Sequence, residues 1–196
     1  MSISLKKGQK VSLSKESGES LSNVIVGLGW DEAPVKKKLF GPKPEPIDCD
    51  ASAFALIGGK IVDKSDIVYF GHLTHKTNCI VHMGDNLTGE GNGDDEQIMI
   101  DLAMLPPEYD KIIIVVNIFQ ARARNQHFGM IQNAYIRIED GMTHKEFCRY
   151  NLTDDYSGST ALVFGEVYRR GNEWKFNAIG QGTTDNSIDE LAKKYK

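Results

Sequence analysis

Alternation of apolar and polar residues dominates this 196-residue chain. A period of two is typical of β-strands, whose successive side chains point to opposite faces. Many short strands at near-regular spacing favour an all-β protein, either a sandwich or a barrel. The predicted strands are Ser2–Leu5, Val11–Leu13, Val24–Leu28, Ala53–Ile57, Ile67–Phe70, Ile80–Met83, Ile98–Leu102, Ile112–Phe119, Tyr135–Ile138, Ala161–Tyr168 and Trp174–Ile179.

Turn and cap residues add short helical segments to this pattern. Ser187 is a suitable N-cap for a C-terminal helix over Ile188–Tyr195. Thr143 and Glu146 have the spacing of a capping box, which predicts a short helix from His144. Between the last two strands, Arg169–Glu173 contains Gly and Asn and is typical of a hairpin turn.

The chain is expected to form one domain over residues 1–185, followed by a helical tail over 186–196. Four of the six prolines fall in the Lys- and Pro-rich segment Ala33–Pro46, which predicts a long surface loop. The hydrophobic fraction of 40% and the charged fraction of 26% are ordinary for a protein with a packed core.

Compartment is indicated by what the sequence does not contain. No apolar run approaches the roughly 20 residues of a membrane span, and the N-terminus has no apolar signal region. The three cysteines are odd in number and widely scattered, which favours a reducing compartment. We therefore expect a cytoplasmic protein with no direct membrane insertion.

Negative charge is concentrated in the middle of the chain. No Lys or Arg occurs from Met83 to Asp110. The acids there are Asp85, Glu90, Asp94, Asp95, Glu96, Asp101, Glu108 and Asp110. Such a segment repels itself unless a cation neutralises it, and it disfavours a nucleic-acid partner.

The segment Gly84–Glu96 combines five carboxylates with four glycines and Asn and Thr oxygens. Calcium accepts six to eight oxygen ligands in flexible geometry, so this composition predicts a calcium loop. Magnesium sheds water less readily, and zinc prefers nitrogen and sulfur. The loop is not an EF-hand, because Leu87 and Gly89 stand where that motif needs Asp or Asn. A solvated acidic hairpin is the simpler alternative.

Other acids are candidates to join this loop. Asp31 follows an apolar stretch, and Asp48 and Asp50 flank Cys49 just before a predicted strand. Loops of a sandwich cluster at its two ends, so convergence of these acids with Gly84–Glu96 is a reasonable hypothesis.

Two further constellations carry weaker signals. His72, His75, Cys79 and His82 have zinc-like spacing, but they would not share one face of a strand, and exposed hairpin residues are the favoured interpretation. Arg122, Arg124 and Arg137 are candidates for binding an anion, although arginines near a sheet more often form internal ion pairs.

Several segments together resemble the TerD family of tellurium-resistance and stress proteins. The resemblance is carried by Gly84–Gly91 with Gly93–Glu96, Gly27–Asp31, Asp48–Phe54, Arg124–Gly129, Asn133–Arg137, Gly165–Arg169 and Glu173–Phe176. Their order and spacing hold from about Ser2 to Gly182, nearly the whole chain. The long acidic motif is highly specific, although Asn92 stands where it often has Asp.

The resemblance implies a two-sheet β-sandwich that binds two calcium ions. It also implies a non-enzymatic binding or scaffold component of tellurite resistance and stress responses, with other proteins of those systems as partners. Carried over by residue, the metal candidates are Asp31, Asp48, Asp50, Asp85, Asn86, Glu90, Asp94, Asp95 and Glu96. A metal-dependent hydrolase or anion-processing enzyme, and a calcium-dependent lectin, are the alternatives.

Overall fold

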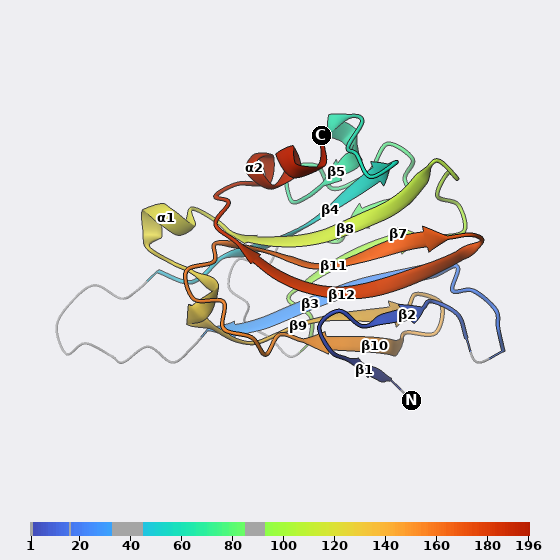
Figure 1. Ribbon diagram of the computed structural model, residues 1–196, viewed down its shortest axis with the longest axis horizontal. Helices are drawn as coiled ribbons and strands as arrows, with labels where there is room; N and C mark the ends of the chain where they lie inside the picture. The colour runs from blue at the N-terminus through green and yellow to red at the C-terminus, as the bar shows by residue number, and fades with distance from the viewer. Residues whose placement is uncertain (1, 16, 33–44, 85–92) are drawn as a thin grey trace.

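Two six-stranded sheets face each other in the computed structural model, which describes residues 2–15, 17–32, 45–84 and 93–196 (Figure 1). The first sheet has the order β1 (Ile3–Leu5), β10 (Lys145–Asn151), β9 (Ile131–Asp140), β3 (Asn23–Glu32), β7 (Glu96–Asp101) and β6 (Ile80–His82). The second has the order β2 (Lys10–Ser12), β12 (Glu173–Thr183), β11 (Ala161–Arg170), β8 (Tyr109–Ile118), β4 (Cys49–Ile57) and β5 (Ile67–Val68). The predicted all-β sandwich is confirmed.

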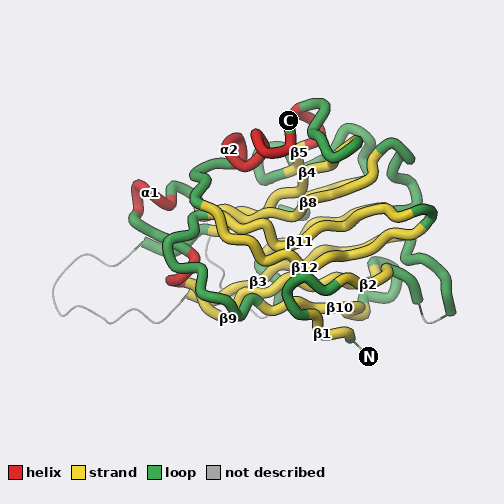
Figure 2. The backbone as a smooth tube through the Cα atoms, viewed as in Figure 1, coloured by secondary structure: helices red, strands yellow, loops and turns green. Residues whose placement is uncertain are grey.

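Paired neighbours are antiparallel except β1 and β10, which are parallel. Among the described residues, helical structure is confined to short pieces at the periphery (Figure 2). These are α1 (Ala121–Arg124), α2 (Ile188–Ala192) and the 3₁₀ turns Lys64–Asp66, Phe128–Met130 and Lys193–Tyr195. Within the described ranges, none of these helices has the length and apolar character needed to cross a membrane.

The main core lies between the two sheets. On β4, Cys49, Ala51, Ala53 and Ala55 belong to this inter-sheet cluster and are fully buried. Small side chains on β4 leave room for the large aliphatic residues of β8 and of the facing sheet, so that the layers interdigitate. Trp30 and Trp174 are 6% and 5% exposed and also belong to this core.

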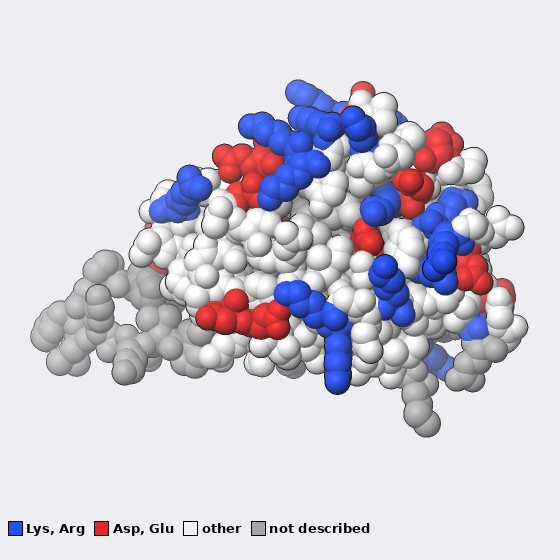
Figure 3. Space-filling model, viewed as in Figure 1, with Lys and Arg blue, Asp and Glu red and all other residues white. Residues whose placement is uncertain are grey.

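A second, smaller core covers the outer face of the second sheet. Phe54 and Leu56 on β4 and Val115 on β8 point away from the first sheet and are buried by Leu191 of α2 and its neighbours. Central strands of this sheet are therefore apolar on both faces. Lys and Arg side chains gather on the solvent side of the C-terminal segment (Figure 3).

Both the predicted C-terminal helix and the predicted hairpin are confirmed. The Ser187 hydroxyl accepts a hydrogen bond from the Glu190 backbone N–H at 3.2 Å and so caps α2. Strands β11 and β12 are joined by Gly171 and Asn172, with Gly171 at a φ of +62°. A positive φ is the backbone conformation that a two-residue hairpin needs and that glycine adopts at little cost.

The predicted helix from His144 is wrong, because the segment forms strand β10. His144 has a φ of +55° and ends a turn in which the Asp140 carboxylate accepts from the Met142 backbone N–H at 2.9 Å. Glu146 binds Arg149 and Ser2 instead of capping a helix. Cys148 and Tyr150 are buried at alternate positions, and their burial favours a strand over a capped turn of helix.

Most of the predicted surface loop Ala33–Pro46 lies outside the described residues. Its last two residues are described: Glu45 is exposed, and the Arg124 Nε lies 3.1 Å from the Glu45 Oε2.

We predict that Leu191→Ala lowers the free energy of unfolding by about 2–4 kcal/mol, because it empties a fully buried position beneath α2. The measurement is equilibrium denaturation in urea, with the exposed Lys193→Ala as a matched control in the same segment. An unchanged unfolding free energy for Leu191→Ala would show that α2 does not contribute to the second core.

Candidate metal centre

Acids from three strands lie at one end of the sandwich. Asp31 lies near the end of β3, Glu96 begins β7, and Asp50 is the second residue of β4. Strands β3 and β7 pair antiparallel with Leu28 opposite Glu96, which places the end of β3 beside the start of β7. The described acids predicted as metal ligands thus reach the same end of the fold from both sheets.

Glu96 connects the two sheets directly. Its side chain is 2% exposed, and its Oε2 accepts a hydrogen bond from the Ala51 backbone N–H on β4. The Nε2 of His82, also buried, lies 3.7 Å from the same oxygen. A carboxylate buried between sheets needs a donor such as the Ala51 N–H, because desolvation without one is costly.

Asp94 is neutralised by an arginine of the protein. Arg137 on β9 binds both carboxylate oxygens, at 2.7 and 2.8 Å, while Tyr135 and Gln97 donate at 3.0 and 2.9 Å. Burial alone would raise the pKa of Asp94, but these hydrogen bonds and the Arg137 charge hold it below its ordinary value. The expectation that such arginines form internal ion pairs is confirmed for Arg137.

Room for this ion pair is made by a glycine on the neighbouring strand. A Cβ placed on Gly27 would lie 2.0 Å from the Asp94 Oδ2, so no other residue fits there without moving Asp94. Gly29 likewise faces the Tyr135 ring, which would lie 2.4 Å from a Cβ at that position. The Gly-x-Gly pattern of β3 therefore serves side-chain packing over the sheet.

Asp95 occupies a different environment, beside a pocket of about 610 Å³ that Asp31 also lines. Its Oδ2 accepts from the Trp30 backbone N–H at 2.7 Å, and Asp31 accepts from Asn133 at 2.8 Å. Burial raises the pKa of Asp95, and the charges of Asp31 and Asp94 raise it further against the opposing Trp30 hydrogen bond. A cation close to Asp95 would reverse this effect.

On the facing sheet, Asp50 is 3% exposed and its Oδ2 accepts from the Asn117 side chain at 3.3 Å. The pKa of the neighbouring Cys49 thiol is raised by its burial and by the charges of nearby acids. Burial raises its pKa well above the ordinary value, and Asp50, Glu96, Asp48 and Asp95 raise it further, in that order. The fold therefore concentrates the charge of several carboxylates around the start of β4, and the Cys49 thiolate is strongly disfavoured.

Of the nine predicted ligands, Asp85, Asn86 and Glu90 lie outside the described residues. In the part of the chain that is described, no group of three or more His, Cys, Asp and Glu side chains is arranged so that it could hold a metal ion. The donors at this end of the sandwich are mainly carboxylate, amide and backbone oxygens, the chemistry that suits a hard divalent cation such as calcium. The residues present therefore fit calcium as a donor set.

Sequence reasoning did not connect several residues of this region with the predicted ligands. Arg137, Asn117, Trp30 and His82 all contact predicted ligands, but each contact joins positions distant along the chain or depends on strand register. The pairing of Asn117 with Asp50 follows from the register of β8 and β4. Only the acidic motif itself carried a local signal.

Three of the four residues with zinc-like spacing, His75, Cys79 and His82, are buried, so their interpretation as exposed hairpin residues is wrong. His72 is half-buried. His75 is 0% and His82 is 2% exposed. Asp66 accepts from the Tyr109 hydroxyl at 2.8 Å and lies 3.2 Å from the His75 Nε2. Burial lowers the pKa of His75 in spite of Asp66, so His75 is a neutral, hydrogen-bonded core residue.

Comparison with known proteins establishes the family. The TerD domain model matches residues 1–195, and the chain belongs to this family. It is 49% identical over 201 residues to "Stress response protein SCP2" of Bacillus subtilis (strain 168), covering 100% of both chains. It is 48% identical over 183 residues to "Tellurium resistance protein TerD" of Serratia marcescens, covering 93% of this chain and 91% of that one.

Solved structures share the fold at lower identity. "Crystal structure of unknown function protein SAV2460" gives a TM-score of 0.68 at 24% identity, over 88% of this chain and 95% of that chain. A TerD homologue from Streptomyces coelicolor A3(2), SCO6318, gives 0.66 at 22% identity, over 90% and 99%. The sandwich is therefore the fold of these proteins as well.

We predict that Arg137→Met lowers the free energy of unfolding by about 3 kcal/mol or more, because it leaves the buried Asp94 carboxylate without its cation. The double variant Arg137→Met/Asp94→Asn should regain much of that loss, since the uncompensated charge is then absent. Denaturant unfolding of both, with the exposed Arg170→Met as control, measures the coupling. Purely additive effects would mean that the ion pair contributes nothing.

Proposed function

We propose that this protein is a calcium-binding member of the TerD family that acts in stress and tellurium resistance as a non-enzymatic binding or scaffold component. The observation that carries the proposal is the gathering of carboxylates from β3, β4 and β7 at one end of the sandwich. Relatives at 45–49% identity are named as stress or tellurium-resistance proteins, and none of these names describes an enzyme.

Electrostatics supplies the proposed mechanism. Burial beside Asp31 and Asp94 makes ionisation of Asp95 unfavourable, and a bound divalent cation would hold Asp95 ionised. Calcium at this end would draw together acids of both sheets, with Asp31, Asp48, Asp50, Asp95 and Glu96 as the described candidates. Asp85, Asn86 and Glu90 of the same acidic segment complete the proposed ligand set for two ions.

Asp94 has a separate role in this proposal. Its bidentate pair with Arg137 already supplies the positive charge that it needs, so we assign it to positioning β7 rather than to the ion. The same pairing, together with Glu139 at 3.0 Å, occupies the Arg137 guanidinium and weighs against its use as an oxyanion-binding group of a hydrolase.

The proposed output is a surface ordered by the ion. Because Glu96 joins the two sheets through Ala51, neutralising the acids around it would stabilise both strand ends at once. The ordered end then presents a defined face to partner proteins of stress or tellurium-resistance systems.

The test is a melting temperature measured in chelator, in magnesium and in calcium. Saturating calcium binds only the folded state, so it should raise the melting temperature by about 5–10 °C at roughly a hundredfold excess over its Kd, with a smaller effect of magnesium. Asp95→Asn and Asp50→Asn should each reduce the calcium effect, whereas the exposed Glu108→Gln should not. Equal melting temperatures in calcium and chelator would rule out the proposal.

A further inference from the structure

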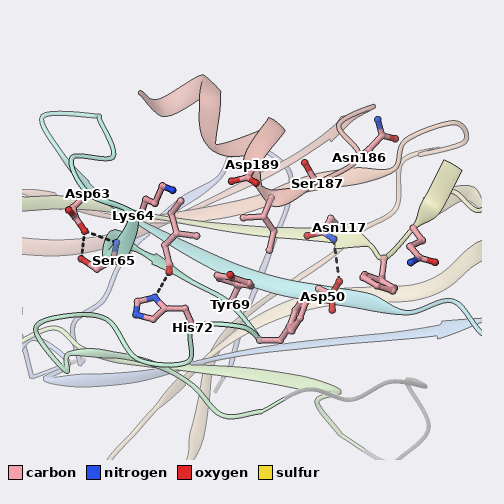
Figure 4. Close-up of a pocket in the computed structure, with 15 residues that line it drawn as sticks. Asp50, Asp63, Lys64, Ser65, Tyr69, His72, Asn117, Asn186, Ser187 and Asp189 are labelled. Carbon is pink, nitrogen blue, oxygen red and sulfur yellow. Dashed lines mark hydrogen bonds between the residues drawn. The ribbon is translucent and has the colours of Figure 1, made fainter. Parts of the chain in front are cut away.

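A pocket opens on the outer face of the second sheet. Its volume is about 790 Å³, within the range of small-molecule sites. The segment 63–72 forms one side and the start of α2 forms another, while Asp50 and Asn117 lie on the strands between them (Figure 4). No function proposed above uses this cavity, although Asp50 borders it.

Asn117 presents a buried acceptor to this pocket. The residue is 5% exposed, and its side-chain NH₂ group donates to the Asp50 carboxylate at 3.3 Å. A carboxylate only accepts, so this contact fixes the amide orientation and turns Oδ1 away from Asp50 (Figure 4). That oxygen has no hydrogen-bond partner among the described residues. A buried carbonyl oxygen without a donor is costly, which indicates that a ligand donor belongs there.

Asn186, just before α2, repeats the arrangement. Its backbone N–H and its side-chain NH₂ donate to the Glu190 Oε2 at 2.8 and 3.4 Å. The amide is again oriented by a carboxylate, and its Oδ1 is buried with no partner in the described part of the chain. Because Asn186 is a lining residue of the pocket, a second amide oxygen without a donor lies at its border.

The aromatic rings and charged groups that line the pocket restrict the chemical class of ligand that could supply these donors. Tyr69 and Phe70 line the pocket and contact each other edge to face, with centroids 5.4 Å apart. The Arg124 guanidinium already lies 5.3 Å from the third ring, Phe119. Three carboxylates and one ammonium also line the cavity: Asp50, Asp63, Asp189 and Lys64. Acceptors, aromatic faces and net negative charge together favour a cation with an apolar body.

We propose that this pocket binds a small organic amine in its protonated form. The ammonium group donates to the Asn117 Oδ1, the Asn186 Oδ1 accepts a further ligand donor, and the apolar body lies against Tyr69 and Phe70. A metal ion would satisfy the amide oxygens but would gain nothing from the rings, which is why an organic cation is the better occupant. This inference does not depend on calcium binding.

The experiment is a calorimetric titration of the full chain in chelator with phenylethylamine, phenylethanol and phenylpropionate as probes. These share a ring and differ in the charge of the attached group. The amine should bind saturably, and the neutral and anionic probes at least about tenfold more weakly, because hydrogen bonds to a charged donor are the stronger ones. Equal binding of the alcohol, or no saturable binding of the amine at millimolar concentration, would overturn the proposal.

Substitutions of the lining residues test whether the amine binds in this pocket. Asn117→Ala should weaken amine binding at least about tenfold, and Tyr69→Ala should also weaken it, whereas the exposed Asn151→Ala should not. If Asn117→Ala does not melt cooperatively, Asn186→Ala replaces it. Wild-type affinity in the folded pocket variants contradicts the assignment. The two proposals can fail separately. Amine binding by a protein whose melting temperature does not respond to calcium refutes only the calcium site. A calcium effect on melting without amine binding refutes only this pocket.

Discussion

Carboxylates buried at one end of a β-sandwich are the constraint on which this structure depends. Three consecutive acids, Asp94, Asp95 and Glu96, lie at the start of β7, and each has a different hydrogen-bond partner. Asp94 is paired with Arg137, Asp95 accepts the Trp30 backbone N–H, and Glu96 accepts the Ala51 backbone N–H of the opposite sheet. Because an uncompensated buried charge would cost several kcal/mol, the surrounding strands must hold these donors in place.

This constraint connects the fold to the proposed function. The hydrogen bond from Ala51 to Glu96 makes the acidic end a junction between the sheets, and burial together with the charges of Asp31 and Asp94 raises the pKa of Asp95 at this end. An ion bound beside these acids would offset their charge and stabilise the junction. On the outer face of the second sheet, the 790 Å³ pocket and the second core share the C-terminal segment, and Asp50 also lines this pocket.

Much of the fold was predictable from the sequence because strand periodicity and turn chemistry are local. Gly171 predicted the turn of the last hairpin, and Ser187 predicted the start of α2. Strand ends were less predictable: β3 continues through Gly29 to Glu32, because its glycines make room for Asp94 and Tyr135 from other strands. The helix expected at His144 failed for a similar reason, since burial of Cys148 and Tyr150 depends on tertiary packing.

The candidate site was predictable in composition but not in geometry. The acidic motif identified Asp94, Asp95 and Glu96 without distinguishing them, and only the packed structure separates an arginine-paired carboxylate from one beside a pocket. Arg137 lies 43 positions from Asp94, and no spacing rule joins residues so far apart. The amide oxygens of Asn117 and Asn186 became apparent only once their carboxylate partners were known.

Calorimetric titration of the full chain with calcium tests the central claim most directly. The account predicts saturable binding of two ions per chain, with altered stoichiometry or affinity when Glu96→Gln removes the charge at the junction between the sheets. Absence of saturable heat, or a Glu96→Gln titration identical to that of the unmodified chain, would contradict it.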